Sequence, residues 1–143
     1  MLKGIPGILS PELLKILMEM GHGDEIVISD GNFPAASIAK RLVRCDGHNV
    51  PEVLDAILKF FPLDTYSVAP VSLMEAVQGD KVETPIWDVY KDIVKKHEPV
   101  ANKIQNIERF AFYEKAKTAY AVVATGEKAL YANIILKKGV VVE

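Results

Sequence analysis

Three consecutive β-branched residues, Ile26-Val27-Ile28, lie between a helix-like segment and an Asp-Gly pair. A strand with one face in water alternates apolar and polar residues, whereas a continuous apolar run is typical of a strand buried on both faces. Such strands belong to mainly parallel sheets covered by helices on both sides. We therefore expect an α/β fold, a three-layer α/β/α sandwich, with Asp30 at the carboxyl end of this strand. Small ligands bind at that edge of such sheets.

Helix and strand patterns alternate along most of the chain, which favours one α/β domain over residues 1–143. A proline near the first turn marks the start of the three longest predicted helices. These helices are expected at residues 10–20, 50–61 and 84–94, with shorter ones after Pro34 and at 110–117. Further strands are expected at residues 42–43, 68–73, 104–107, 120–125 and 130–136.

Composition limits the partners and the compartment. The net charge is −2, so we expect no basic surface for nucleic acid. No apolar stretch has the length of a membrane span, and the N-terminus lacks a signal-peptide pattern. Cys45 is the single cysteine, which suits a reducing compartment, so we expect a cytoplasmic protein with no membrane partner. The positive mean hydropathy of +0.15 indicates that some apolar surface is buried between subunits.

His22 lies between two glycines in the turn before the predicted strand. An imidazole titrates close to neutral pH, so it can give or take a proton in catalysis. The alternative is an exposed histidine that merely follows a helix C-cap. Asp30 offers a carboxylate that orients the histidine, acts as a base or holds a hydroxyl, and its alternative is a turn-forming role in Asp-Gly. We expect the two side chains to lie one loop apart.

The sequence carries no signature of a cofactor. Asp24 and Glu25 follow His22, but no second histidine or cysteine falls at metal-ligand spacing. Gly21-His22-Gly23 precedes a strand and lacks a third glycine, so it is not a dinucleotide-binding loop. No glycine-rich loop ending in Lys-Ser or Lys-Thr occurs. We therefore expect neither a metal nor another cofactor.

Two polar side chains in the C-terminal third are further candidates. Arg109 lies at a predicted strand-to-helix junction, where a guanidinium can bind two hydroxyls of a polyol or form an ordinary surface ion pair. Asn133 lies within a strand-like run, where asparagine is disfavoured. Hydrogen bonding to a sugar would explain that placement, and exposure at a strand edge is the alternative.

Two blocks of the sequence resemble one known family. The blocks are LLKILMEMGHGDEIVISDGNFPA, from residue 13, and RFAFYEKAKTAYAVVATGEKALYANIILKKGV, from residue 109. Together they resemble the ribose pyranase and L-fucose mutarotase family, and its fucose branch in particular. The similarity runs from Leu2 to Val140, and the Asp-Gly-Asn-Phe-Pro loop at residues 30–34 follows the fucose pattern better than the ribose pattern.

The resemblance assigns roles to particular residues. The catalytic acid of the family falls on His22, and we expect Asp30 to stabilise the charged histidine or to hold the sugar. Relatives often carry glycine at the position of Ala132, so we expect its extra methyl group to narrow the pocket. The sugar-binding positions of the family fall on Asp30, Arg109, Tyr131, Ala132 and Asn133.

The resemblance also implies an activity and an assembly. The implied activity is that of an L-fucose mutarotase, which interconverts the α and β anomers of its monosaccharide substrate without a cofactor. The implied assembly is a ring-shaped homo-oligomer, commonly a decamer, with sites completed across subunit boundaries. D-Ribose pyranase activity is the nearest alternative, although the ribose branch tends to carry histidine at the position of Arg109. A non-catalytic sugar-binding module and a phosphohistidine carrier using His22 are the more distant alternatives.

Overall fold

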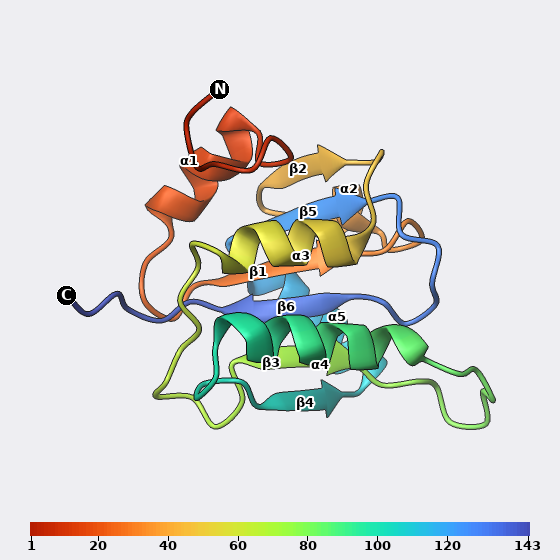
Figure 1. Cartoon of the computed structure of the whole chain (residues 1–143). Helices are drawn as coiled ribbons and strands as arrows, with labels where there is room; N and C mark the ends of the chain where they lie inside the picture. The colour runs from red at the N-terminus through yellow and green to blue at the C-terminus, as the bar shows by residue number, and fades with distance from the viewer.

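Six strands form one sheet in the computed structural model, which describes all 143 residues (Figure 1). The strands are β1 (Glu25–Ser29), β2 (Leu42–Cys45), β3 (Val71–Met74), β4 (Ile104–Ile107), β5 (Ala121–Thr125) and β6 (Ile134–Lys137). Their order across the sheet is β2-β5-β1-β6-β3-β4. Only β6 is antiparallel to its neighbours, β1 and β3, so the prediction of a mainly parallel sheet is confirmed.

Helices cover both faces of this sheet (Figure 1). They are α1 (Pro11–Glu19), α2 (Ala35–Ile38), α3 (Val50–Leu58), α4 (Pro85–His97) and α5 (Arg109–Thr118). The buried side chains of α1, α3 and α4 join one core cluster, and those of α2 and α5 join a second cluster on the opposite face. The predicted three-layer α/β/α sandwich is therefore confirmed. None of the five helices is both long enough and apolar enough to cross a bilayer.

Successive residues of β1 enter opposite layers of the core. Ile26 and Ile28 belong to the larger cluster, whereas Val27 belongs to the smaller one. The side chains alternate because neighbouring residues of a strand point to opposite faces of the sheet. All three are fully buried, which explains why this strand has no polar face.

Polar caps start two of the helices where the sequence predicts them. The Ser10 hydroxyl accepts a hydrogen bond from the Leu13 N–H at 3.1 Å, and the Asn49 side chain accepts one from the Glu52 N–H at 3.0 Å. Each cap satisfies a backbone donor that has no partner within the helix. Pro11 then occupies the first turn of α1, where its missing N–H costs nothing.

Two predicted strands begin later in the structure. The strand expected at residues 68–73 is β3, which starts at Val71, and the strand expected at 130–136 is β6, which starts at Ile134. In the second case Tyr131 takes a left-handed backbone conformation, with φ 52°, which no strand accommodates. The expectation that Asn133 lies inside a strand is therefore wrong, because the residue ends a loop.

The reversed direction of β6 determines which loops meet. Since β6 is antiparallel to β1 and β3, its amino end lies at the same edge of the sheet as their carboxyl ends. The loop before β6 consequently lies beside the loops that follow β1 and β3. This edge also carries the junction between β4 and α5, because β4 is parallel to β3.

We expect Gly126→Ala to destabilise the protein by about 1–3 kcal/mol, a typical cost of overpacking. A methyl group at Gly126 would overlap the Asp46 carbonyl oxygen, which belongs to the backbone and so cannot move aside as a flexible side chain could. Urea unfolding measures the loss. Gly47→Ala is the matched control, because nothing lies within 4 Å of a methyl group at that position. Equal stability of the two variants would contradict the expected overlap.

Candidate functional site

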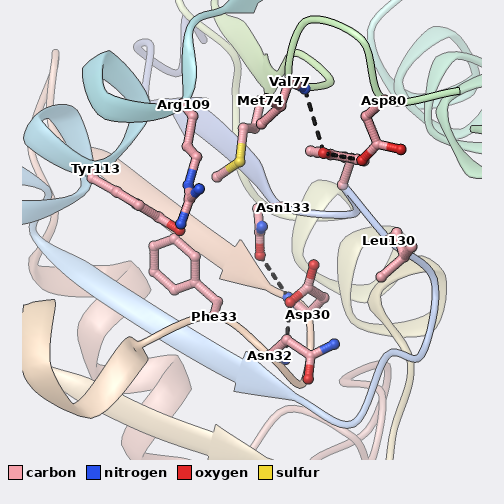
Figure 2. Close-up of a pocket in the computed structure, with 11 residues that line it drawn as sticks. Asp30, Asn32, Phe33, Met74, Val77, Asp80, Arg109, Tyr113, Leu130 and Asn133 are labelled. Atoms are coloured by element: carbon pink, nitrogen blue, oxygen red, sulfur yellow. Dashed lines mark hydrogen bonds between the residues drawn. The ribbon is translucent and has the colours of Figure 1, made fainter. Parts of the chain in front are cut away.

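A cavity of about 250 Å³ opens at the carboxyl ends of β1 and β3 (Figure 2). It lies at the edge of the sheet where ligands bind in folds with parallel strands. Polar side chains from four separate segments share the lining with apolar and aromatic ones. The lining residues are Asp30, Asn32, Phe33, Met74, Val77, Asp80, Arg109, Tyr113, Leu130, Tyr131 and Asn133.

Asp30 directly follows β1 and is held by the backbone around it. One carboxylate oxygen accepts the Asn32 N–H at 3.0 Å, and the other accepts the Ala132 N–H at 3.4 Å. The side chain is nearly inaccessible to solvent, and this burial raises the pKa of the Asp30 carboxyl while the backbone donors oppose the shift. The carboxylate therefore presents fixed acceptor lone pairs to the cavity.

Asn133 lies opposite Asp30 at the end of the loop that precedes β6 (Figure 2). Its side-chain oxygen accepts the Asp30 N–H at 2.8 Å. Its amide nitrogen has no partner within the chain, so both N–H groups remain available to a ligand. Asn133 is buried, so exposure at a strand edge does not explain an asparagine at this position. Its hydrogen bond to the Asp30 backbone does.

Arg109 is the first residue of α5, and its position is fixed by the helix cap. The preceding Glu108 carboxylate accepts the N–H groups of Phe110 and Ala111, both at 3.0 Å. The guanidinium donates to the Tyr113 hydroxyl at 3.3 Å and lies beside the rings of Phe110 and Tyr113. No carboxylate lies within 4.0 Å of it, so the alternative of an ordinary surface ion pair is wrong.

Tyr131 reaches the cavity from a constrained backbone. The Trp87 indole N–H donates to its carbonyl at 2.7 Å, which stabilises the left-handed conformation at this residue. The phenol donates to Asp80 at 2.6 Å and accepts the Val77 N–H at 3.3 Å. The Asp80 carboxylate raises the pKa of the Tyr131 phenol, because it accepts the phenolic hydrogen.

Ala132 contributes its backbone and not its side chain. Its N–H donates to Asp30, and its carbonyl accepts the Tyr90 hydroxyl at 2.7 Å. The methyl group is fully buried in the larger core cluster. The expectation that this methyl group narrows the pocket is therefore wrong, because it points into the core.

His22 lies at the opposite edge of the sheet from this cavity. It precedes β1, whereas Asp30 follows β1, and a strand of five residues spans roughly 17 Å. The expectation that His22 and Asp30 lie one loop apart within the chain is therefore wrong. The sequence places them close together, but the strand between them is fully extended.

A buried carboxylate orients the His22 ring. The His22 Nε2 atom lies 3.0 Å from the Oδ1 atom of Asp64, which also accepts the Tyr66 N–H at 3.1 Å. The Oδ2 atom of Asp64 accepts the Ser67 hydroxyl at 2.6 Å. The hydrogen bonds from Ser67 and His22 lower the pKa of the Asp64 carboxyl to about 2. Since Asp64 is ionised at neutral pH, Nε2 donates its hydrogen to the carboxylate, and Nδ1 has no hydrogen-bond partner within the chain. A carboxylate that fixes the tautomer in this way is typical of histidines that transfer protons.

Sequence reasoning missed Asp64 and Asp80, which contact His22 and Tyr131 respectively. Both contacts join residues far apart in the chain, over 42 and 51 positions. No local pattern predicts such pairs. The Asp-Thr-Tyr-Ser segment from Asp64 has the composition of a turn, but a turn signal does not identify the distant partner.

The cavity combines acceptors, donors and apolar walls in a small volume. Asp30 accepts, Asn133 and Arg109 donate, and the ring of Phe33 packs against that of Tyr113 at 5.6 Å between centroids. This combination suits a small polyhydroxylated molecule, whose hydroxyl groups both donate and accept. No group of three or more His, Cys, Asp or Glu side chains is arranged to hold a metal ion. The fold and cavity thus define an α/β protein with a polar small-molecule site.

The chain belongs to the RbsD / FucU transport protein family, whose model matches residues 3–141. The human fucose mutarotase is 53% identical to it over 145 residues, which cover 97% of this chain and 94% of that protein. The fucose mutarotase of Streptococcus pneumoniae, solved in complex with L-fucose, is 55% identical with a TM-score of 0.94, covering 99% of this chain and 100% of that one. FucU from Bifidobacterium longum is 62% identical with a TM-score of 0.95, covering 98% and 100%.

We expect Asp64→Asn to lower the free energy of unfolding by about 2 kcal/mol at neutral pH. The folded state lowers the pKa of this carboxyl from 3.8 to about 2. A depressed pKa contributes stability that is complete above the unfolded value and is lost as the pH falls through the folded value. Urea unfolding at about pH 7 and about pH 3 should therefore show a smaller difference between variant and wild type at the lower pH.

Asp92→Asn is the matched control for this measurement. Its carboxylate is exposed and makes no hydrogen bond or ion pair, so its removal should leave stability nearly unchanged at both pH values. A difference between Asp64→Asn and wild type that stays constant with pH would contradict the assigned cause.

Proposed function

We propose that this protein is an L-fucose mutarotase, an isomerase that interconverts the α and β anomers of L-fucose in fucose metabolism. The observation that carries this proposal is the whole-chain similarity to a fucose mutarotase solved with L-fucose. The polar cavity supports it, because its donors and acceptors match the hydroxyl groups of a monosaccharide. A location in the cytoplasm is part of the proposal, supported by a single buried cysteine that forms no disulfide.

Anomer exchange needs two proton transfers and no redox chemistry. A proton is delivered to the ring oxygen while another leaves the anomeric hydroxyl, and the ring opens to an aldehyde. The carbonyl group then rotates, and the ring closes on its other face. Side chains alone can supply these steps by general acid-base catalysis.

The residues of the cavity bind and orient the sugar in this proposal. Asp30 accepts hydrogen bonds from sugar hydroxyls through a carboxylate that the backbone already holds in place. Asn133 donates through its free amide nitrogen, and Arg109 donates through nitrogens that no carboxylate occupies. These groups are arranged before the ligand arrives, which reduces the cost of binding.

His22 acts as the acid from a neighbouring subunit in this proposal. Within one chain it lies at the other edge of the sheet, so a second copy must bring its Nδ1 atom to the cavity. Asp64 holds the Nε2 hydrogen, so the acid is the imidazolium form of His22, which carries a second hydrogen on Nδ1. A contact between two different edges of the same protein is heterologous, and repetition of it closes into a ring when the rotation permits. The ring-shaped decamer that the family resemblance implies would be built with such contacts.

Exposed apolar side chains around His22 support such a contact. The ring of Tyr66, 79% exposed, lies 5.5 Å from the imidazole. The C-terminal segment leaves the sheet beside this site, because the Lys138 carbonyl accepts the Gly23 N–H at 2.8 Å. Its last apolar residues, Val141 and Val142, are also exposed. A subunit contact would bury this apolar surface together with His22.

We expect His22→Ala to slow anomer exchange of L-fucose by about 10²–10⁴-fold, the usual contribution of a positioned acid. Saturation-transfer NMR measures the exchange directly when one anomer's signal is inverted and the other is observed. His48→Ala is the matched control, since its side chain is 43% exposed against 45% for His22 and also contacts a carboxylate. Exchange that persists in His22→Ala would contradict the assignment.

The same measurement separates the alternative functions. D-Ribose in a parallel sample tests for pyranase activity, and exchange of ribose without exchange of fucose would favour that function. Fucose that binds without faster exchange would leave a sugar-binding module. Neither alternative has a specific structural observation in its favour.

We expect two inactive variants, His22→Ala and Arg109→Ala, to restore activity when they are co-expressed. If each site joins the cavity of one subunit to His22 of the next, random mixing leaves about a quarter of the sites intact. Exchange rates of the purified mixture, compared with each variant alone, measure this recovery. A mixture no more active than its components would place the whole site in one chain and contradict the shared arrangement.

A further inference from the structure

We infer that Asp80 is a positioning residue for the proton acceptor of this reaction, and that it takes up the anomeric proton through Tyr131. This inference rests on the proposed mutarotase function. It deepens that function, because it identifies the group that accepts the anomeric proton while His22 donates a proton to the ring oxygen.

The hydrogen bonds of Tyr131 decide how its phenol meets a ligand. A phenol has one hydrogen to donate, and Tyr131 gives it to Asp80 at 2.6 Å. The oxygen also accepts the Val77 N–H at 3.3 Å, which leaves one lone pair. Tyr131 lines the cavity, so it can accept a hydrogen bond from a sugar hydroxyl but has no hydrogen left to donate.

Asp80 lies on the loop between β3 and α4, where a tight turn presents it to the phenol. Its own N–H donates to the Val77 carbonyl at 2.9 Å, and Gly79 supplies the positive φ of 88° that closes the turn. Both contacts of this turn with Tyr131, from Val77 and from Asp80, converge on the same oxygen. The turn therefore fixes the phenol from two sides.

Asp80 suits a proton acceptor better than Asp30 does. Asp30 is buried, and backbone N–H groups occupy both of its oxygens, so it serves as a rigid binding group. Asp80 is exposed, lines the cavity, and contacts no cation. Water can therefore reach its carboxylate and stabilise either protonation state during the reaction.

The proposed step balances without any added reactant. The proton of the anomeric hydroxyl passes to the Tyr131 oxygen while the phenolic hydrogen passes to the Asp80 carboxylate. The electron pair of the anomeric O–H bond becomes the second bond of the carbonyl group. At the same time the bond between the anomeric carbon and the ring oxygen breaks. The ring oxygen keeps the electron pair of the broken C–O bond and takes the Nδ1 proton of a protonated His22 from a neighbouring subunit. Ring closure on the other face returns both protons by the same routes.

We expect Asp80→Asn to slow anomer exchange by about 10²-fold at saturating L-fucose, because an amide cannot take up the relayed proton. The dissociation constant of L-fucose should change by less than about twofold, since Asp80 acts through Tyr131. Asp80→Glu should restore part of the rate. Glu83→Gln, which neutralises an exposed carboxylate of the same loop that makes no hydrogen bond, is the matched control.

Two further measurements identify the route through Tyr131. In a Tyr131→Phe background, Asp80→Asn should cause no additional loss, because the relay is already broken. NMR of ¹³C-labelled tyrosine should show that Asp80→Asn lowers the pKa of Tyr131 towards its ordinary value, since the carboxylate raises it in the wild type. This titration reports the contact without reference to activity.

The outcomes separate this inference from the function on which it rests. Wild-type protein that exchanges L-fucose, with Asp80→Asn equally fast, would overturn the role of Asp80 alone. A loss in the Tyr131→Phe background as large as in the wild type would overturn the route through Tyr131. Wild-type protein that does not accelerate exchange would overturn the proposed function, and the relay with it.

Discussion

The hydrogen bonds between Asp30 and the loop before β6 are the link on which the cavity depends. The Asp30 backbone donates to Asn133, and the Asp30 carboxylate accepts from Ala132, so two segments about 100 residues apart are joined by both side chain and backbone. Ala132 in turn is held by Tyr90 of α4. Each partner is buried, which makes these bonds costly to break. The walls of the cavity are consequently part of the core and not a flexible rim.

The sequence predicts the elements better than it predicts their contacts. The apolar run of β1 and the prolines of α1 and α3 are local signals, and the structure agrees with them. The start of β6 is not predictable from composition, because a single left-handed residue, Tyr131, delays it. The sequence does not predict the roles of Asp64 and Asp80, because the residues that they contact are distant in the chain. His22 shows the opposite error. It lies near Asp30 in the sequence, which suggested that the two side chains are near each other in space, but the extended strand β1 separates them.

The two halves of the proposed chemistry lie at opposite edges of one sheet. The cavity with Arg109 lies at one edge, and His22 with Asp64 lies at the other. Each half is held by its own buried carboxylate, Asp30 or Asp64. If the proposed ring is correct, an isolated subunit would bind the sugar but would not catalyse anomer exchange, because it lacks the His22 of a neighbour. Catalytic activity would then depend on protein concentration by mass action, as assembly does.

The place of the last two strands in the sheet bears on how the chain is made. β5 separates β2 from β1, and β6 separates β1 from β3, so residues 121–137 fill both gaps. A chain still emerging from the ribosome has only β3 and β4 as sheet neighbours, with several apolar strand edges unpaired. Such edges are prone to aggregation, and the sheet cannot close until β5 and β6 have been synthesised. The topology thus delays closure of the sheet until β5 and β6 have left the ribosome.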